Sequence, residues 1–187
     1  LGIPKGSMTL IAARAGMGKT SFGLHIALTQ AVNKRRPVLF ACLEMSREEI
    51  VPRALAWISG IDADRLRVPD RLTPSEKERF KHAEIELRTI PLIIMDNCGS
   101  TPSAIKEEAQ RIKRRMGDLS LVIVDYIQLM TGPGDNRESI VAGLSRSLTK
   151  AARVLGVPVV ALAQLNREAE KRSNRRPLLA DLRESGG

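Results

Sequence analysis

Short apolar runs alternate along this chain with longer segments in which apolar residues recur at helical spacing. The apolar runs, which predict β-strands, cover residues 8–12, 37–43, 91–95, 121–124 and 157–163. Strands that alternate with helices are typical of an α/β domain in which helices cover both faces of a mostly parallel sheet. No internal repeat interrupts this order, so the 187 residues predict one domain that spans positions 1–187.

Helix signals fill the intervals between the apolar runs. Ser46 is a predicted N-cap, and Thr73-Pro-Ser-Glu76 has the order of a capping box with proline at the first helical position. After Pro102, apolar residues recur at helical spacing up to Met116. The expected helices cover residues 21–33, 48–58, about 74–88, 102–116 and 138–155.

The first apolar run leads into a loop of small residues and then into a predicted helix. The loop and the first helical turn contain Arg14, Ala15, Gly16, Met17, Gly18, Lys19, Thr20 and Ser21. This is the order of a phosphate-binding loop, although the strict pattern has glycine where this chain has Ala13. Small residues allow backbone N–H groups to surround a phosphate, and the helix N-terminus adds partial positive charge. Lys19 is therefore expected to contact the β- and γ-phosphates, and Thr20 to ligate Mg²⁺.

Polar residues stand where three of the other predicted strands end. These residues are Glu44, Asp125 and Gln164. Since ligands of open parallel sheets bind outside the carboxyl ends of the strands, we expect the three side chains to converge on the bound phosphates. Asp96 ends a fourth run, but the neighbouring Asn97 favours a plain turn there.

The chemistry of phosphoryl transfer to water suggests a role for each of these side chains. Asp125 follows four apolar residues, which is a Walker B pattern, so its carboxylate is expected to support the Mg²⁺ ion. Glu44 is the candidate for accepting a proton from the attacking water. Gln164 is a neutral hydrogen-bonding group that is suited to sensing the γ-phosphate. The sequence therefore predicts a site for ATP and Mg²⁺.

The charge of the chain indicates a polyanionic partner. Its formal net charge is +9, and basic residues concentrate between positions 167 and 183, where apolar periodicity is weak. A mobile basic loop over about 166–187 that contacts a phosphate backbone is one interpretation, and a solvated connector is the other. Because aromatic residues make up only 3% of the chain, charge rather than base stacking is expected to dominate any contact with nucleic acid.

The cysteines, the length of the apolar runs and the N-terminal residues indicate where in the cell the protein is expected to work. Cys42 and Cys98 lack metal-ligand spacing and are interpreted as free thiols of a cytosolic protein. No apolar run approaches the length needed to cross a bilayer, so no membrane association is expected. The chain begins at Leu1 without a signal-peptide pattern, and we therefore expect a piece of a longer cytoplasmic protein.

Five segments of the chain resemble the ATPase domain of bacterial replicative DNA helicases, the DnaB family, which has a RecA-like fold. The segments are Ala-Ala-Arg-Ala-Gly-Met-Gly-Lys-Thr (12–20), Leu-Glu-Met-Ser (43–46), Val-Asp-Tyr-Ile-Gln-Leu-Met (124–130), Val-Pro-Val-Val-Ala-Leu-Ala-Gln-Leu-Asn-Arg (157–167) and Asp-Leu-Arg-Glu-Ser-Gly (181–186). They occur in the order found in that family. The resemblance implies a RecA-like P-loop NTPase that works as a ring-shaped homohexamer around single-stranded DNA. It also implies contacts with primase and a helicase loader through regions outside this chain.

The resemblance also assigns roles to individual positions. It implies that Lys19 and Thr20 bind phosphate and Mg²⁺, that Asp125 supports the metal, and that Glu44 is the catalytic glutamate. Gln164 matches the glutamine that links nucleotide state to DNA. The loop that follows the DNA backbone is matched by Arg183, Glu184 and Gly186. A position near the nucleotide base is matched by Arg53.

The family's domain continues beyond the last residue of this chain, with strands that carry an arginine finger. Since an arginine finger contributes about 10³–10⁵ in rate where it operates, we expect the isolated 187 residues to bind nucleotide but to hydrolyse it poorly. Three alternatives share the nucleotide site: a RecA-type recombinase, an ATP-gated switch or loader protein, and a P-loop small-molecule kinase. The segment at 181–186 favours the helicase over the first two.

Overall fold

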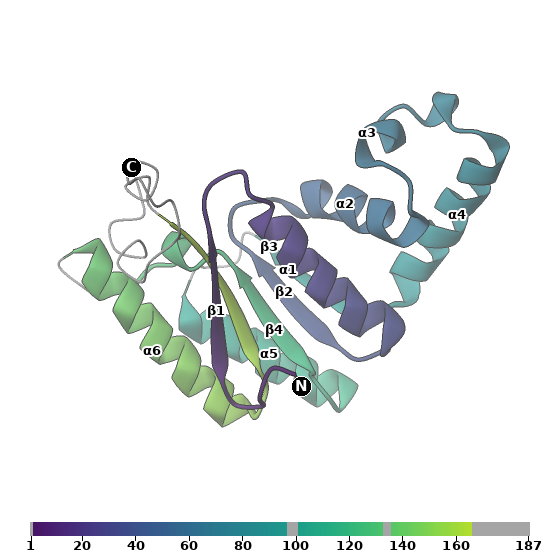
Figure 1. Cartoon of the computed structure of the whole chain (residues 1–187). Helices are drawn as coiled ribbons and strands as arrows, with labels where there is room; N and C mark the ends of the chain where they lie inside the picture. The colour runs from purple at the N-terminus through teal and green to yellow at the C-terminus, as the bar shows by residue number, and fades with distance from the viewer. Residues whose placement is uncertain (1, 97–100, 133–135, 166–187) are drawn as a thin grey trace.

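Parallel strands form a single sheet in the described part of the chain, which covers residues 2–96, 101–132 and 136–165 of a computed structural model. The strands are β1 (Met8–Ala13), β2 (Val38–Cys42), β3 (Leu92–Asp96), β4 (Leu121–Asp125) and β5 (Val159–Gln164). Their order across the sheet is β1-β5-β4-β2-β3, and each neighbouring pair is parallel (Figure 1). All of the apolar runs that predict strands are strands, and the prediction of a parallel α/β domain is confirmed.

The predicted helices are also present. They are α1 (Lys19–Leu28), which continues as a π-helical turn (Thr29–Asn33), α2 (Arg47–Ser59), α4 (Pro74–Thr89), α5 (Pro102–Met116) and α6 (Arg137–Leu155). The structure adds three short elements that the sequence pattern did not predict: α3 (Ala63–Leu66) and the 3₁₀ turns Pro69–Arg71 and Ile127–Leu129. Within the described residues, no helix is both long enough and apolar enough to cross a membrane.

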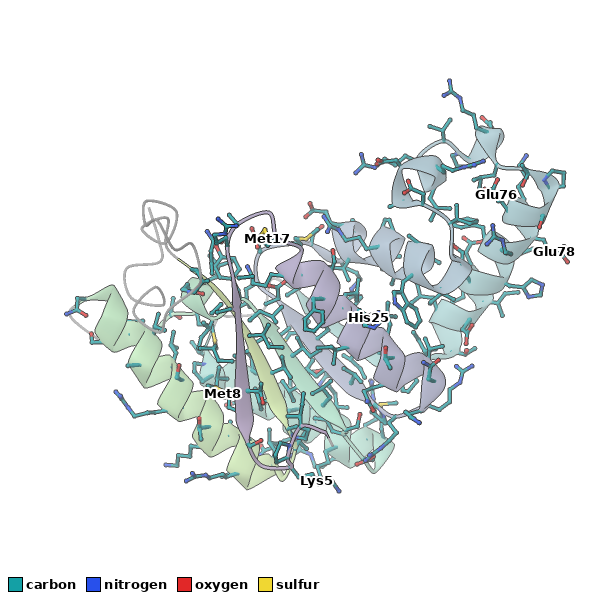
Figure 2. The ribbon with its side chains drawn as sticks, in the orientation of Figure 1. Lys5, Met8, Met17, His25, Glu76 and Glu78 are labelled. Atoms are coloured by element: carbon teal, nitrogen blue, oxygen red, sulfur yellow. The ribbon has the colours of Figure 1, made fainter. Side chains whose placement is uncertain are left out.

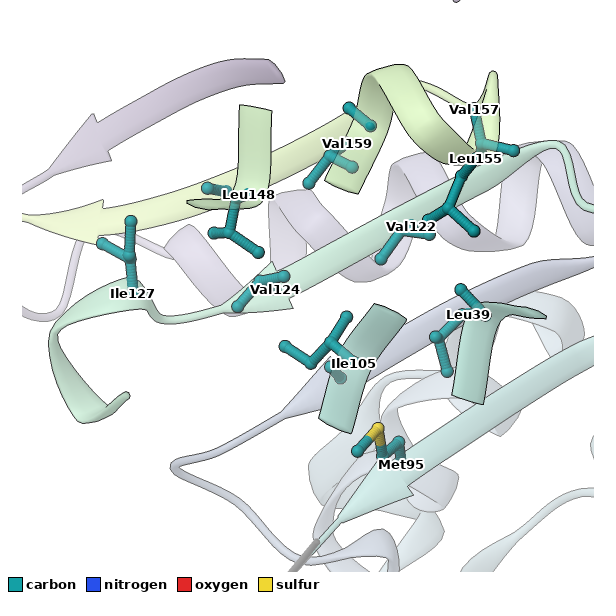
Figure 3. Close-up of a cluster of buried hydrophobic side chains, with 14 of the residues drawn as sticks. Leu39, Met95, Ile105, Val122, Val124, Ile127, Leu148, Leu155, Val157 and Val159 are labelled. Carbon is teal, nitrogen blue, oxygen red and sulfur yellow. The ribbon is translucent and has the colours of Figure 1, made fainter. Parts of the chain in front are cut away.

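Alternation of side chains along the strands divides the core into two layers. On β2, Leu39 and Ala41 face the layer that contains α5 and α6, whereas Val38 and Phe40 face the layer that contains α1 and α2. Figure 3 shows the first layer, where Leu148 of α6 lies over β4 and β5. Because both faces are covered, every residue of β2 and β4 is buried, as expected for central strands of a parallel sheet.

Capping interactions fix where the helices begin. At the start of α4, the Thr73 N–H donates to Glu76 Oε2 at 2.8 Å, and the Glu76 N–H donates to Thr73 Oγ1 at 3.3 Å. At the start of α2, the Ser46 N–H donates to Glu49 Oε2 at 3.0 Å. Both predicted caps are confirmed, and the second one sets the direction of the chain directly after Glu44.

A candidate nucleotide site at the carboxyl edge of the sheet

The phosphate-binding loop lies between β1 and α1. Gly16 and Gly18 have φ values of 74° and 79°, in the left-handed region that favours glycine. Gly18 occupies the N-cap position of α1, and its carbonyl accepts the first helical hydrogen bond from Phe22 N–H at 2.9 Å. The loop residues Ala15 to Gly18 are exposed, and Figure 2 labels Met17 among them. A loop of this shape presents the unpaired amides of a helix N-terminus to an anion.

Lys19 connects the loop to the segment that follows β4. Its ammonium nitrogen lies 4.0 Å from the centre of the Tyr126 ring, in a cation–π contact. Tyr126 is the residue directly after Asp125. The lysine of the phosphate loop and the Walker B segment are therefore in direct contact.

Asp125 is a buried carboxylate at the end of β4. It has no exposed surface, and neither carboxylate oxygen has a well-formed hydrogen bond to a residue in the described part of the chain, although the Thr20 hydroxyl is close enough to affect it. Burial raises the pKa of Asp125, while the Thr20 hydroxyl and the Lys19 ammonium act in the opposite direction. A buried carboxylate without hydrogen bonds is costly, and a cation is the ligand that relieves that cost. Thr20 and Asp125 therefore fit the requirements of a Mg²⁺ site.

Glu44 lies beyond the end of β2, next to β4 in the sheet. The Leu43 N–H donates to the Asp125 carbonyl at 2.7 Å, so the turn that carries Glu44 is attached to the backbone of Asp125. The Glu44 side chain is exposed, and its charge raises the pKa of Asp125 further. A carboxylate held at this place and open to solvent can face an attacking water.

Gln164 is the last residue of β5, the strand between β1 and β4. It is half-buried and is aligned with Ala13, the last residue before the phosphate loop. The Leu165 N–H donates to the Ala13 carbonyl at 3.0 Å. The structure thus brings Lys19, Asp125 and Gln164 to one edge of the sheet, together with Glu44.

A cleft lies beside the phosphate loop, between α1, α2 and α3. It has a volume of about 720 Å³, and both Ser21 and Arg53 line it. Trp57 Nε1–H donates to His25 Nδ1 at 2.8 Å, which ties α2 to α1 across this cleft (His25 is labelled in Figure 2). The positive charge of Arg53 acts to lower the pKa of Asp125.

Sequence reasoning missed some residues that shape the site. Asp96 is more than the plain turn that the sequence favours, because Asp96 Oδ2 accepts a hydrogen bond from the Arg47 N–H at 2.9 Å. The Arg47 guanidinium also donates to the Ile94 carbonyl at 3.0 Å, so β3 anchors the start of α2. Tyr126 and Gln128 lie in the Val-Asp-Tyr-Ile-Gln-Leu-Met segment (124–130). Their side chains contact residues that are distant in the sequence, Lys19 and Gln164.

The predicted DNA-contacting positions lie outside the described residues. These positions are Arg183, Glu184 and Gly186, together with the basic segment at about 166–187. Their roles stay predictions.

The parallel sheet and the loop at its carboxyl edge define a P-loop ATPase domain with a RecA-like fold. The model of the DnaB-like helicase C terminal domain matches residues 1–187, and the chain belongs to this family.

Curated relatives are similar along almost the whole chain. The replicative DNA helicase DnaB of Pasteurella multocida (strain Pm70) is 41% identical over 188 residues, which cover 99% of this chain and 40% of that protein. The replicative DNA helicase DnaB of Nostoc sp. (strain PCC 7120 / SAG 25.82 / UTEX 2576) is 40% identical over 186 residues, which cover 99% of this chain and 21% of that protein. This chain therefore spans less than half of the length of these relatives.

Solved structures show the same architecture. A DnaB-like replicative helicase, studied together with its interactions with primase, has a TM-score of 0.90 and 33% identity, covering 99% of this chain and 45% of that one. A second solved structure, of an ATPase domain, has a TM-score of 0.88 and 34% identity, covering 97% of this chain and 66% of that one. These matches confirm the resemblance to DnaB-type ATPase domains and favour it over the recombinase and switch alternatives.

Proposed function

We propose that this chain is the ATP-hydrolysing motor domain of a replicative DNA helicase, which moves along single-stranded DNA and unwinds duplex DNA. One observation carries the proposal. Glu44, Asp125 and Gln164 lie at the carboxyl ends of three neighbouring strands beside a phosphate-binding loop, in a chain that matches the helicase family over its whole length. A hydrolytic site needs this combination of phosphate binding, a buried carboxylate and an accessible base.

In this proposal, the phosphate-binding loop and the cleft beside it bind ATP. The amides of the loop residues Arg14 to Gly18 surround the phosphates, and Lys19 neutralises the β- and γ-phosphate oxygens. The Lys19 ammonium also contacts the Tyr126 ring, which joins this phosphate-binding group to the segment after Asp125. Arg53 lines the same cleft as Ser21, which supports its proposed position near the base.

The metal and the two polar side chains at the strand ends complete the site. Thr20 and Asp125 would hold Mg²⁺, which neutralises charge on the phosphate oxygens when it is bound. Glu44 accepts the proton of the attacking water. Gln164 responds to the γ-phosphate, and the basic segment that follows it contacts the DNA backbone through Arg183, Glu184 and Gly186.

The assembly and the partners extend this proposal. The family membership supports a homohexameric ring around single-stranded DNA, with primase and a helicase loader as partners of regions outside this chain. The solved helicase that resembles this chain interacts with primase. Because replication of bacterial DNA takes place in the cytoplasm, we propose a cytoplasmic location for the protein.

The test is ATP turnover by the intact protein, measured with and without single-stranded DNA. We expect DNA to stimulate turnover. Glu44→Gln should lower it about 10²- to 10⁴-fold, the usual contribution of a general base, while nucleotide still binds. Arg183→Ala should lose the stimulation. Glu78→Gln and Arg88→Ala, two exposed changes on α4, are the matched controls. If DNA leaves turnover unchanged in the wild type, the motor function is wrong and an ATP-gated switch is favoured.

A further inference from the structure

The side chain of Gln128 forms two hydrogen bonds with the backbone of a single residue, Gln164. Gln128 Nε2–H donates to the Gln164 carbonyl at 2.8 Å, and the Gln164 N–H donates to Gln128 Oε1 at 3.2 Å. Gln128 is only 8% exposed, and it lies in the 3₁₀ turn that follows β4. A buried primary amide that satisfies both polar groups of one residue is a specific arrangement, because an apolar residue of the same size would leave both groups unpaired.

The hydrogen bonds between Gln128 and Gln164 take the place of backbone pairing between β4 and β5 beyond the point where that pairing ends. The pairing between β4 and β5 ends at Val124 and Ala161, three residues before the end of β5. Beyond that point Gln128 supplies the donor and the acceptor that the neighbouring strand would otherwise supply. On the opposite side, Gln164 is aligned with Ala13 of β1. The backbone of Gln164 is therefore held between the strand that enters the phosphate loop and the segment that follows Asp125.

The segment that carries Gln128 also contacts the phosphate-binding lysine. Tyr126 lies under the Lys19 ammonium, two residues before Gln128. The intervening Ile127 is fully buried, and hydrogen bonds from Leu129 N–H to the Tyr126 carbonyl and from Met130 N–H to the Ile127 carbonyl close the turn. Since this turn is short and anchored in the core, Tyr126 and Gln128 are expected to move together.

We infer that Gln128 is a positioning residue that couples the nucleotide site to the segment after Gln164. Because Lys19 contacts the Tyr126 ring, the turn at residues 126–130 touches the group that is proposed to bind the phosphates. The two hydrogen bonds between Gln128 and Gln164 would pass a displacement of this turn to the backbone of Gln164. This inference rests on the proposed function, because the segment after Gln164 is the one proposed to contact DNA.

The test compares variants of Gln128 with the same changes at Gln110, a half-buried glutamine on α5 that is not among the proposed site residues. Gln128→Met removes both hydrogen bonds and keeps the length of the side chain. Gln128→Glu removes the donor and keeps the acceptor for Gln164 N–H. For each variant of the intact protein, the ratio of DNA-stimulated to basal ATP turnover is measured. The Kd for an oligonucleotide is also measured with and without a non-hydrolysable ATP analogue.

We expect the stimulation ratio, and the effect of the analogue on the Kd, to fall about tenfold in Gln128→Met, within the usual range of coupling between two sites. The Gln110 variants should keep both values. A role in folding alone would lower basal and stimulated turnover together and leave their ratio unchanged, which would overturn the inference. Thermal unfolding verifies that the variants fold, and Gln128→Glu carries the test if Gln128→Met does not. An absence of stimulation in the wild type would instead contradict the proposed motor function.

Discussion

Single residues decide how closely the phosphate-loop helix approaches the sheet. Gly23 of α1 is buried, and a Cβ atom at this position would lie 2.7 Å from Leu162 Cδ1 of β5 and 3.6 Å from Ile123 Cγ2 of β4. A larger residue would have to displace α1 or repack the core. Because α1 begins at Lys19 and Thr20, its distance from the sheet also sets the position of the phosphate-binding groups.

Replacing Gly23 with valine is expected to destabilise the protein. Overpacking of this kind costs about 1–3 kcal/mol, which outweighs the modest gain in helix propensity. Urea unfolding measures this cost, and nucleotide binding should weaken in parallel. Combining Gly23→Val with Leu162→Ala should cost less than the sum of the two single changes, because the truncated leucine makes room for the valine. Strictly additive costs would contradict the proposed close contact.

Cys42 provides a prediction about pH. It is 1% exposed on β2, and burial raises the pKa of its thiol from 9.0 to about 11, with the Asp125 charge acting in the same direction. Below pH 9.0 the thiol is protonated in both the folded and the unfolded chain. As the pH rises toward about 11, the unfolded chain loses this proton first, so stability decreases across this interval.

The measurement is urea unfolding between pH 8 and pH 11 in a Cys98→Ser background, so that a single thiol titrates. The free energy of unfolding should fall by about 2–3 kcal/mol more in this protein than in the further Cys42→Ala variant. Equal decreases in the two proteins would show that the Cys42 thiol does not contribute to the pH dependence.

Part of the site could be predicted from sequence because its residues follow apolar strands. Glu44, Asp125 and Gln164 each stand at the end of an apolar run, and parallel strands bring such ends to one edge. The roles of Tyr126 and Gln128 could not be predicted this way. Gln128 bonds to a residue 36 positions away, and its polar character inside an apolar segment was the only signal of a specific partner.

At the scale of elements, helix boundaries follow from local chemistry. The capping box of α4 joins Thr73 and Glu76 through reciprocal hydrogen bonds, and Arg65 of α3 adds an ion pair to Glu76 at 2.8 Å. These bonds hold the pKa of Glu76 below its usual value, with the bond from the Thr73 backbone as the largest cause. The same few residues thus start α4 and attach α3 to it.

Thr73→Ala removes the side-chain half of this cap. The expected loss is about 1 kcal/mol, as for other threonine caps. The free energy of unfolding in urea measures the loss, and amide hydrogen exchange should show that the first turn of α4 opens more often. Ser75→Ala, one exposed residue inside the same turn, is the control and should change stability by less than about 0.5 kcal/mol. Similar losses in both variants would contradict the role of the cap.

Elements with a long periodic pattern were predictable, whereas short ones were not. The helix at 74–89 has both a capping box and several turns of pattern, but α3 spans only Ala63–Leu66 and is too short to show a period. One local signal of α3 exists in the sequence, because aspartate, here Asp62, is a favoured N-cap residue. In the structure, Asp62 Oδ1 accepts a hydrogen bond from Asp64 N–H at 2.8 Å and caps the helix.

At the scale of the whole molecule, the order of the strands determines which residues meet. The sequence predicts parallel strands but not the order β1-β5-β4-β2-β3, since each crossover is specified by packing between distant residues. This order puts β5 between β1 and β4. Gln164 consequently lies between Ala13, which precedes the phosphate loop, and Gln128, which follows Asp125.

The net charge of +9 and the basic residues after Gln164 lead to a prediction about salt. Six residues between 167 and 183 are basic: Arg167, Lys171, Arg172, Arg175, Arg176 and Arg183. If they neutralise six phosphates of single-stranded DNA, the plot of log Kd against log salt concentration should have a slope of magnitude about 4, because each contact contributes about 0.7. Fluorescence anisotropy with a labelled oligonucleotide gives this slope when it is measured between about 50 and 300 mM salt, a range that includes physiological ionic strength.

Changing one arginine of this segment separates phosphate contact from general electrostatic attraction. Arg183→Ala should reduce the magnitude of the slope by about 0.7, since one counterion fewer is released on binding. Arg88→Ala lowers the net charge by the same amount at an exposed position on α4, away from the carboxyl edge of the sheet, and should leave the slope unchanged. If both changes reduced the slope equally, net charge alone would account for DNA binding. A slope near zero in the wild type would favour the interpretation of residues 166–187 as a solvated connector.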